Sequence, residues 1–501
     1  MKSIKELSLQ SKTKAFFRNG IKQNFINNTW VSAKSEKKID IINPANEEVI
    51  ARIPISSSED INNAVIAAKE AFQNKEWRKM MPSDRERLLH KLADLIEENA
   101  DYIAEIITLE NGKPFIEAKK SEVMGAAKTF RYYAGWCTKI EGETIDLSIP
   151  QPDNKQNFAF TKREPVGVVA AIIPWNTPFS IAAWKLAPAL SVGCTVVVKP
   201  SEETPLNTLI LAELVTEAGF PAGVVNIVLG DGSTTGNGLV SHPNINKITF
   251  TGSGSVGKTI GKAALDNITA FSLELGGKSP AIVFDDADIE WASKCVANGI
   301  FRNMGQICVS GSRVYIQEKV FDEVMHNISN FAKNMKIGHG FEEGVELGPL
   351  VCKSHFNKVN NYIKTGNDEG AILVSGGKKV KDKGYFLEPA IFSAKDNNLK
   401  IIQEEIFGPV IVCIPFKTID EVIELANQSD YGLSSTVFTK DVSKSMRMID
   451  ELEAGWVWVN SNARSDPHFP LGGFKQSGIG KDLGKEGLYS YTKTKAVNIV
   501  Y

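Results

Sequence analysis

Between residues 167 and 275, short apolar segments alternate with longer segments whose apolar residues recur every three or four positions. We expect strands at 168–174, 195–199, 224–229, 248–251 and 271–275, with helices at 181–190, 206–218, 236–240 and 256–265. Strands that alternate with helices form βαβ units, so this region predicts a parallel sheet covered by helices on both faces. Such a sheet binds its ligands at the carboxyl ends of its strands.

A second series of the same kind begins near Ala281. It predicts helices at 289–301, 321–334 and 355–365, and strands at 371–374, 410–415 and 456–460. Residues 58–136 are dominated by helical spacing. Because 501 residues exceed what one hydrophobic core accommodates, we expect an α/β protein of roughly two to four domains.

Two stretches resemble extended arms. Residues 144–162 are polar and hairpin-like, and residues 494–501 form a terminal strand with no partner nearby in the sequence. A lone terminal strand often pairs with the sheet of another subunit, so we expect self-association.

Charge and cysteine content argue against several classes of protein. The net charge of −2 favours neither nucleic acid nor an anionic membrane as a partner, and the apolar runs are far shorter than a membrane span of about 20 residues. Residues 1–24 are basic but lack the apolar core of a secretory signal, so we expect a solvated arm rather than an organelle presequence. Six scattered cysteines without a C-x-x-C pair favour free thiols and a cytoplasmic setting. No metal site is expected.

The segment Gly252–Gly257 reads G-x-G-x-x-G after an expected strand and at the start of an expected helix. Its glycines allow the backbone to approach a pyrophosphate, and a helix N-terminus supplies amide donors. In a conventional Rossmann nucleotide site, the downstream acid Glu274 would then bind a ribose. The alternative is an ordinary strand-to-helix turn.

Cys308 differs from the other cysteines because it lies in NMGQICVSGS, a segment rich in Gly, Ser and Asn. A catalytic thiol needs such a polar, partly exposed position and a way to become a thiolate. No neighbouring cation in the sequence lowers its pKa, and a protease-like pair with His242 or His468 stays open.

Glu274 stands in the apolar segment Leu273–Gly277, LELGG. Burial of a carboxylate without partners is costly and raises its pKa, which would make Glu274 a general base near neutral pH. The alternative is a carboxylate at a strand edge that accepts hydrogen bonds from the glycine amides.

Seven motifs together resemble the aldehyde dehydrogenase superfamily, from Phe25–Asn28 to the final strand. They are FSLELGGKSP with its 34-residue spacing from Glu274 to Cys308 in NMGQIC, Pro174–Asn176, KPSEETP, FTGSGSVG, EEIFGP and PLGGFKQSG. The resemblance implies the aldehyde dehydrogenase fold, an α/β fold with three parts. These are a Rossmann-like NAD-binding domain (1–143 and 163–273), an α/β catalytic domain (274–478) and a small β oligomerisation arm (144–162 and 479–501). A dimer or a dimer of dimers is implied as well.

The resemblance also implies catalytic roles. Cys308 would attack an aldehyde carbonyl, and Asn176 with the Cys308 backbone N–H would form the oxyanion hole. Glu274 would activate the water that hydrolyses the thioester, which replaces the ribose interpretation above. Lys185 and Asp482 resemble a relay that serves Glu274, although many relatives have Glu at the position of Asp482.

The implied cofactor is NAD, with NADP as an alternative. Lys199 and Glu202 match positions that hold the adenosine ribose, and the Glu202 carboxylate would repel a 2′-phosphate. Ser253 would meet the pyrophosphate. The full set of implied cofactor residues is Ile172, Trp175, Lys199, Ser201, Glu202, Gly232, Gly252, Ser253, Val256, Leu275, Glu405 and Phe407.

The implied substrate tunnel is mostly apolar and fits a medium-sized apolar or aromatic aldehyde, as in phenylacetaldehyde-type members. Its expected residues are Thr177, Ile181, Trp184, Ile307, Arg464 and Leu471. Arg464 and His468 near the mouth favour a carboxylated semialdehyde instead. A CoA-acylating dehydrogenase is a further alternative, which Glu274 argues against because transfer to CoA needs no activated water.

Overall fold

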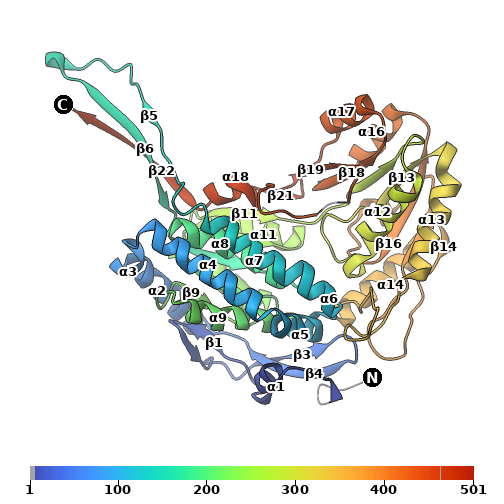
Figure 1. Cartoon of the computed structure of the whole chain (residues 1–501), viewed down its shortest axis with the longest axis horizontal. Helices are drawn as coiled ribbons and strands as arrows, with labels where there is room; N and C mark the ends of the chain where they lie inside the picture. Colours follow the sequence, from blue (N-terminus) through green and yellow to red (C-terminus); the bar gives the residue numbers. More distant parts are fainter. Residues whose placement is uncertain (1–5, 463) are drawn as a thin grey trace.

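Two α/β lobes, each built on a mainly parallel sheet, form the body of the protein, and a three-stranded arm projects from the first lobe (Figure 1). The computed structural model describes residues 6–462 and 464–501. The predicted α/β fold class is confirmed, because both series of strands form the expected parallel arrangement.

The first sheet has the strand order β2-β1-β9-β8-β7-β10-β11-β21, and its five strands from β9 to β11 are parallel. Its strands are β1 (Asn24–Ile26), β2 (Thr29–Val31), β7 (Val168–Ile172), β8 (Thr195–Lys199), β9 (Val225–Ile227), β10 (Lys247–Thr251), β11 (Ala270–Glu274) and β21 (Gly478–Ile479). The parallel strands are the ones that the alternation predicts, since each precedes or follows a helix that crosses over the sheet.

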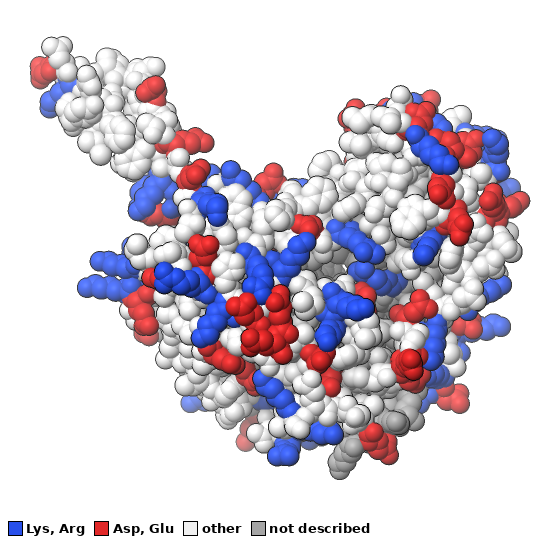
Figure 2. Space-filling model, in the orientation of Figure 1, with Lys and Arg blue, Asp and Glu red and all other residues white. Residues whose placement is uncertain are grey.

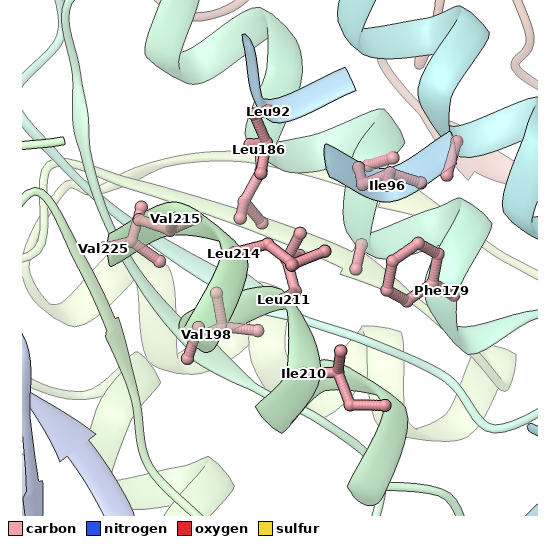
Figure 3. Packing of buried hydrophobic residues seen from close by; sticks show 14 of the residues in the cluster. Leu92, Ile96, Phe179, Leu186, Val198, Ile210, Leu211, Leu214, Val215 and Val225 are labelled. Carbon is pink, nitrogen blue, oxygen red and sulfur yellow. The ribbon is translucent and has the colours of Figure 1, made fainter. Parts of the chain in front are cut away.

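Side chains of this sheet point alternately to two separate cores. Val169 and Ala171 of β7 join the core under α8 and α9, whereas Val168 and Ala170 join the core under α2 and α11. Figure 3 shows the first of these cores, where leucines of α9 pack between β8, β9 and the outer helix α4. The covering helices are α2 (Ser58–Gln73), α4 (Pro82–Glu98), α5 (Ala100–Asn111), α7 (Met124–Ala134), α8 (Pro178–Val192), α9 (Leu206–Ala218), α10 (Asn237–Val240) and α11 (Gly254–Asp266).

The second sheet has the order β14-β15-β16-β13-β12-β18-β19 and is parallel except for β14. Its strands are β12 (Pro280–Val283), β13 (Arg313–Gln317), β14 (Ile372–Ser375), β15 (Ala390–Ser393), β16 (Val410–Phe416), β18 (Ser434–Phe438) and β19 (Trp456–Val459). Its helices are α12 (Ile289–Phe301), α13 (Phe321–Asn334), α14 (Lys353–Asp368), α15 (Lys400–Gln403), α16 (Ile419–Asn427) and α17 (Val442–Glu451). A continuous apolar core joins these helices to the sheet.

The arm consists of β5 (Thr144–Ile145), β6 (Asn157–Pro165) and the C-terminal β22 (Thr492–Val500), which extend away from both lobes (Figure 1). β22 pairs with β6 of the same chain along its whole length, from Thr492↔Pro165 to Val500↔Asn157. The C-terminal part of the arm is shorter than the expected 479–501, because β21 joins the first sheet beside β11 and α18 (Gly484–Tyr489) contacts α8. Of residues 479–501, only those of β22 form a strand of the arm.

The N-terminal region corrects another expectation, for the part of residues 1–24 that lies within the described range. Instead of a solvated arm it forms α1 (Ser11–Arg18), whose Thr13 is buried and whose Phe16 and Phe17 pack against the first core. Smaller elements are α3 (Lys75–Arg78), α6 (Phe115–Glu117), the π-helices η2 (Ala118–Val123) and η4 (Gly232–Gly236), the hairpin β3 (Lys38–Asn43) and β4 (Glu48–Pro54), and the pair β17 (Tyr431–Gly432) and β20 (Phe474–Lys475). Among the described helices, none is long and apolar enough to cross a membrane.

Candidate active site

A cavity of about 120 Å³ lies where the two sheets face each other, and residues from both series line it. Cys308, Glu274 and Asn176 share this cavity with Asp482. All six residues expected to form a substrate tunnel line it too: Thr177, Ile181, Trp184, Ile307, Arg464 and Leu471. The fold therefore gathers residues that lie up to about 300 positions apart in the sequence.

Glu274 ends β11 and is only 4% exposed. Within the described part of the chain, neither of its carboxylate oxygens has a hydrogen-bond partner. Burial and then the charge of Asp482 raise the pKa of Glu274 well above its usual range, while Lys185 opposes the rise. A buried carboxyl with free oxygens that faces a cavity is suited to accept a proton from a molecule bound there.

Cys308 lies half-buried in the loop between the 3-10 helix η5 (Arg302–Gly305) and β13. Burial, followed by the negative charges of Glu405 and Glu274, raises the pKa of the thiol to about 12. The sequence shows no cation near Cys308, and the structure adds two carboxylates. The thiol is therefore protonated at neutral pH in this state of the molecule, and a base must remove its proton before it can act as a nucleophile.

The two glycines after Glu274 allow three segments to meet. The N–H of Gly277 donates to Oε1 of Glu405 at 3.0 Å. A Cβ on Gly277 would lie 2.6 Å from the carbonyl oxygen of Cys308, and one on Gly276 would lie 2.2 Å from Oε2 of Glu405. Because the Cys308 carbonyl is backbone and real side chains do not approach so closely, Gly277 needs to be glycine here, whereas a side chain at Gly276 would displace the Glu405 carboxylate.

Asn176 follows β7 and is buried beside the Cys308 loop. Its side-chain Nδ2 donates to the carbonyl of Gln306 at 2.9 Å, and its own carbonyl accepts from Nδ2 of Asn303 at 3.1 Å. An amide NH₂ carries two hydrogens, so one remains for a molecule in the cavity.

Lys185 and Asp482 form a buried ion pair at 3.0 Å, with relative side-chain exposures of 0% and 2%. Lys185 also donates to Oγ1 of Thr249 at 3.0 Å. This pair influences Glu274 through charge, since Asp482 raises and Lys185 lowers its pKa.

Several of the expected cofactor residues lie at one edge of the first sheet. Ile172, Lys199 and Gly252 end or follow β7, β8 and β10, and these strands are parallel. Lys199 and Glu202 form an ion pair of 2.9 Å at this edge, with Ser201 between them and Leu275 directly after β11. Carboxyl ends of parallel strands are where α/β sheets bind ligands.

The N-terminus of α11 opens toward the same edge. Ser253 is its N-cap, with Oγ accepting from the N–H of Val256 at 3.4 Å, and both residues are exposed. A Cβ on Gly232 or Gly254 would meet no atom within 4 Å, so free space surrounds this helix end. An exposed helix N-terminus beside open space suits a phosphate group.

Trp175 and Phe407 bring an aromatic wall to this region, with ring centroids 5.2 Å apart. His355 of α14, which sequence reasoning missed, packs on Trp175 at 5.0 Å and lies 2.7 Å from the Phe407 carbonyl through Nε2. Burial lowers the pKa of His355 to about 4, so the ring is neutral and donates this bond. The position of His355 in this wall depends on its hydrogen bond to Phe407, which lies 52 residues away in the sequence. No local pattern in the sequence reveals that contact.

Sequence reasoning also missed two residues that line the cavity. Lys113 and Glu122 form a buried ion pair in the cavity wall, 3% and 2% exposed. The spacing of nine residues matches no motif, and both side chains resemble ordinary surface charges in the sequence. Among the described residues, no cluster of three or more His, Cys, Asp or Glu side chains has metal-site geometry.

Comparisons with known proteins agree along nearly the whole chain. Residues 30–497 match the model of the aldehyde dehydrogenase family. The chain is 46% identical over 481 residues to phenylacetaldehyde dehydrogenase of Pseudomonas fluorescens, covering 96% of each protein. It is 46% identical to the mitochondrial aldehyde dehydrogenase of Mesocricetus auratus, covering 95% of each. The structure superposes on the NAD⁺ complex of aldehyde dehydrogenase from Bacillus cereus with a TM-score of 0.95 at 43% identity, covering 98% of this chain and 99% of that one. This protein belongs to the aldehyde dehydrogenase family.

Proposed function

We propose that the protein oxidises an aldehyde to its carboxylic acid with NAD, through a thioester on Cys308. The observation that carries the proposal is that Cys308, Asn176 and the unpartnered carboxyl of Glu274 line one cavity. A nucleophile, an oxyanion donor and a base at one cavity are the groups that acyl transfer to water requires.

In the first half of the reaction, the thiol of Cys308 gives its proton to a water molecule in the cavity, and its sulfur bonds to the aldehyde carbon. The carbonyl oxygen becomes an oxyanion, which the free N–H of Asn176 and the backbone N–H of Cys308 stabilise. Such a donor is typically worth about 3–4 kcal/mol in the transition state. Loss of hydride from this carbon leaves a thioester.

In the second half, Glu274 accepts a proton from water as the water oxygen attacks the thioester carbon. The carbon–sulfur bond then breaks, which releases the acid and returns Cys308. The raised pKa of Glu274 makes it a stronger base than an ordinary carboxylate once it is deprotonated.

The edge of the first sheet fits a dinucleotide. Lys199 and Glu202 would hold the adenosine ribose and Ser253 the pyrophosphate, while Glu405 and Phe407 would hold the nicotinamide ribose. The open space around Gly232 and the exposed start of α11 leave room for these groups. NAD, when bound, supplies the acceptor for the hydride. The carboxylate of Glu202 favours NAD over NADP, because it would repel a 2′-phosphate.

A medium-sized apolar or aromatic aldehyde fits the cavity best. Ile181, Trp184 and Leu471 give it apolar walls, and Trp456 adds a further aromatic ring. The 46% identity to a phenylacetaldehyde dehydrogenase supports an aromatic substrate.

A carboxylated aldehyde is a second candidate, which the mouth of the cavity favours. A neighbouring hollow of about 320 Å³ shares Trp184 with the cavity and is lined by four cations, namely Lys120, Lys128, Arg302 and Arg464. Figure 2 shows Lys and Arg side chains gathered around the hollow between the lobes on this face. Arg302 is paired with Glu117 at 3.2 Å and Lys128 with Asp466 at 2.6 Å, and Arg464 is exposed. Lys120 is exposed too, but it lines only the hollow, whereas Arg464 lines the cavity as well, so Arg464 is the one best placed to meet a carboxylate.

The test is formation of NADH across a panel of aldehydes, with each alkyl aldehyde matched to one that carries a terminal carboxylate. We expect turnover without CoA, no activity for Cys308→Ala, and for Glu274→Ala one burst of NADH without turnover. Normal turnover by Cys308→Ala, or a requirement for CoA, would refute the mechanism. If the substrate is carboxylated, Arg464→Gln raises the KM of the carboxylated member of a pair alone. An equal KM for both members in the native protein excludes this second candidate.

A further inference from the structure

A buried ion pair in the cavity wall has no part in the chemistry proposed above. Lys113 follows α5, and Glu122 lies in the π-helix η2, and both side chains are at least 97% buried. Removing two charges from water costs several kcal/mol per ion, so a buried pair of this kind is weak evidence for a stabilising role. Its other contacts indicate what it does.

Lys113 reaches the loop that carries Asn176. Its Nζ donates to the carbonyl oxygen of Asn176 at 3.3 Å, the same oxygen that accepts from Asn303. Two donors, one of them cationic, thus hold the backbone of Asn176 on one side, while its side chain donates to Gln306 on the other. The peptide plane of Asn176 has little freedom to rotate.

Glu122 fixes the other end of the same loop. One of its oxygens accepts from Lys113, and the other accepts from the N–H of Phe179 at 2.8 Å. Phe179 is in the first turn of α8, where backbone N–H groups lack partners within the helix and a negative charge is favourable. Ser180 adds a hydrogen bond from its Oγ to the carbonyl of Glu122 at 3.0 Å.

The π-helix explains how Glu122 arrives there. η2 interrupts the helical segment between α6 and α7, and its wider turn changes the direction of the side chains. Lys119 on the same π-helix points to the surface and pairs with Asp101, with both side chains about 40% exposed. One face of η2 is therefore solvated and the other faces the cavity.

We propose that Lys113 and Glu122 are positioning residues, which hold the side-chain amide of Asn176 at the place where the oxyanion forms. This inference rests on the proposed function, in which Asn176 is the oxyanion donor. A clamp on the loop from both ends fixes the direction of the remaining N–H before the substrate binds. Preorganised donors of this kind accelerate acyl transfer because no reorganisation is needed during the reaction.

The test is the rate of the NADH burst in the first turnover, measured in native protein and in Lys113→Met/Glu122→Gln. The double variant leaves no unpaired buried charge, and the Gln oxygen still accepts from Phe179. We expect the burst rate to fall roughly 10- to 100-fold, since small misplacements of a donor cost about that much. In an Asn176→Ala background the same double substitution should change the burst rate less than about twofold, because Lys113 and Glu122 act through the side chain of Asn176, which is then absent.

Two further readouts separate positioning from general damage. NAD affinity, measured by quenching of protein fluorescence, and the alkylation rate of Cys308 should both stay within about twofold of native. Lys119→Met, on the solvated face of η2, is the matched control and should keep the native burst rate. If the double variant does not fold, Glu122→Gln alone is measured in both backgrounds, with a smaller loss expected in the native one and none in Asn176→Ala.

Different results would contradict the positioning role and the proposed function. A native burst rate in the double variant, or an equal loss in the Asn176→Ala background, would overturn the positioning role. A parallel fall in NAD affinity and in Cys308 alkylation would overturn it as well. If the native protein forms no NADH with any aldehyde, it is the proposed function that fails.

Discussion

The acidity of Cys308 is set by residues distant in sequence. Glu405 lies close enough to the thiol to rank as the largest contribution after burial, and it is held there by the N–H of Gly277. The same carboxylate is expected to bind the nicotinamide ribose. We therefore propose that cofactor binding and thiol activation are linked at one side chain.

We predict that Glu405→Gln lowers the pKa of the Cys308 thiol, since it removes a negative charge that disfavours the thiolate. Alkylation by iodoacetamide, followed on the Cys308 peptide by mass spectrometry, should become severalfold faster at pH 8. Each unit of pKa is worth about tenfold in thiolate at pH values well below the pKa. Glu404→Gln is the control, because Glu404 instead accepts from the hydroxyl of Tyr362 at 2.7 Å. An unchanged pH profile in Glu405→Gln would contradict this account.

The ion pair of Lys185 and Asp482 predicts two opposite shifts in the pH dependence of turnover. Glu274 acts only when deprotonated, so kcat should rise with pH through its raised pKa, above the ordinary value of about 4.3. Asp482→Asn removes a charge that raises this pKa, and the acidic limb should move to lower pH. Lys185→Met removes a charge that lowers it, and the limb should move to higher pH.

The measurement is kcat against pH under conditions in which a burst shows that hydrolysis of the thioester limits the rate. Shifts in the same direction for both variants would show that the pair does not act on Glu274 through charge.

At the scale of elements, the turn after β11 packs the segment that follows Glu274 against the backbone of Cys308. Gly277→Ala would place a methyl group 2.6 Å from the Cys308 carbonyl and 3.1 Å from Cβ of Leu433, both in packed surroundings. We predict a loss of kcat of at least about tenfold, because the Cys308 loop must shift to make room for the methyl group. Steady-state kinetics and the thermal midpoint are measured together.

Gly261→Ala is the matched control for this substitution. Gly261 lies inside α11, where the added methyl group would make only ordinary contacts of 3.9 Å or longer. Alanine there should keep native kcat and raise stability by about 0.5–1 kcal/mol. Full activity in Gly277→Ala would mean that the loop has room that the packing does not suggest.

For the whole molecule, we propose that the arm mediates self-association. It projects away from both lobes (Figure 1). It exposes Phe158 and Ile499, which are directly opposite each other on β6 and β22 and are each nearly half exposed. Exposed apolar side chains on a projecting sheet are typical of an interface.

We predict that Phe158→Lys/Ile499→Glu reduces the mass measured by light scattering toward that of one chain. The opposite charges preserve the pairing of β6 and β22, so the arm itself should stay folded. The control is Ile372→Lys, because Ile372 is also an exposed apolar residue, 67% exposed, but lies on the edge strand β14 of the second sheet. This variant should keep the native mass. A native assembly in the arm variant would place the interface elsewhere.

Local patterns in the sequence determined the class of fold and the identity of the main chemical groups. Residues 167–275 predicted the parallel sheet because the period of apolar residues is a local property that the two cores then use. Cys308 and Glu274 were noticeable because a thiol among polar residues and an acid in an apolar strand break the local pattern. The resemblance to the family then related them to one reaction.

The tertiary structure alone decided where the charges act. Glu405 faces Cys308, Glu122 holds α8, and β21 joins the first sheet rather than the arm, all through contacts between residues far apart in the chain. In the sequence, Lys113 resembles an ordinary surface lysine, yet the fold buries it against Asn176. Hydrophobic periodicity encodes which face of an element is buried, but the pKa of a group depends on every charge that the fold brings near it. That sum exists only once the chain has folded.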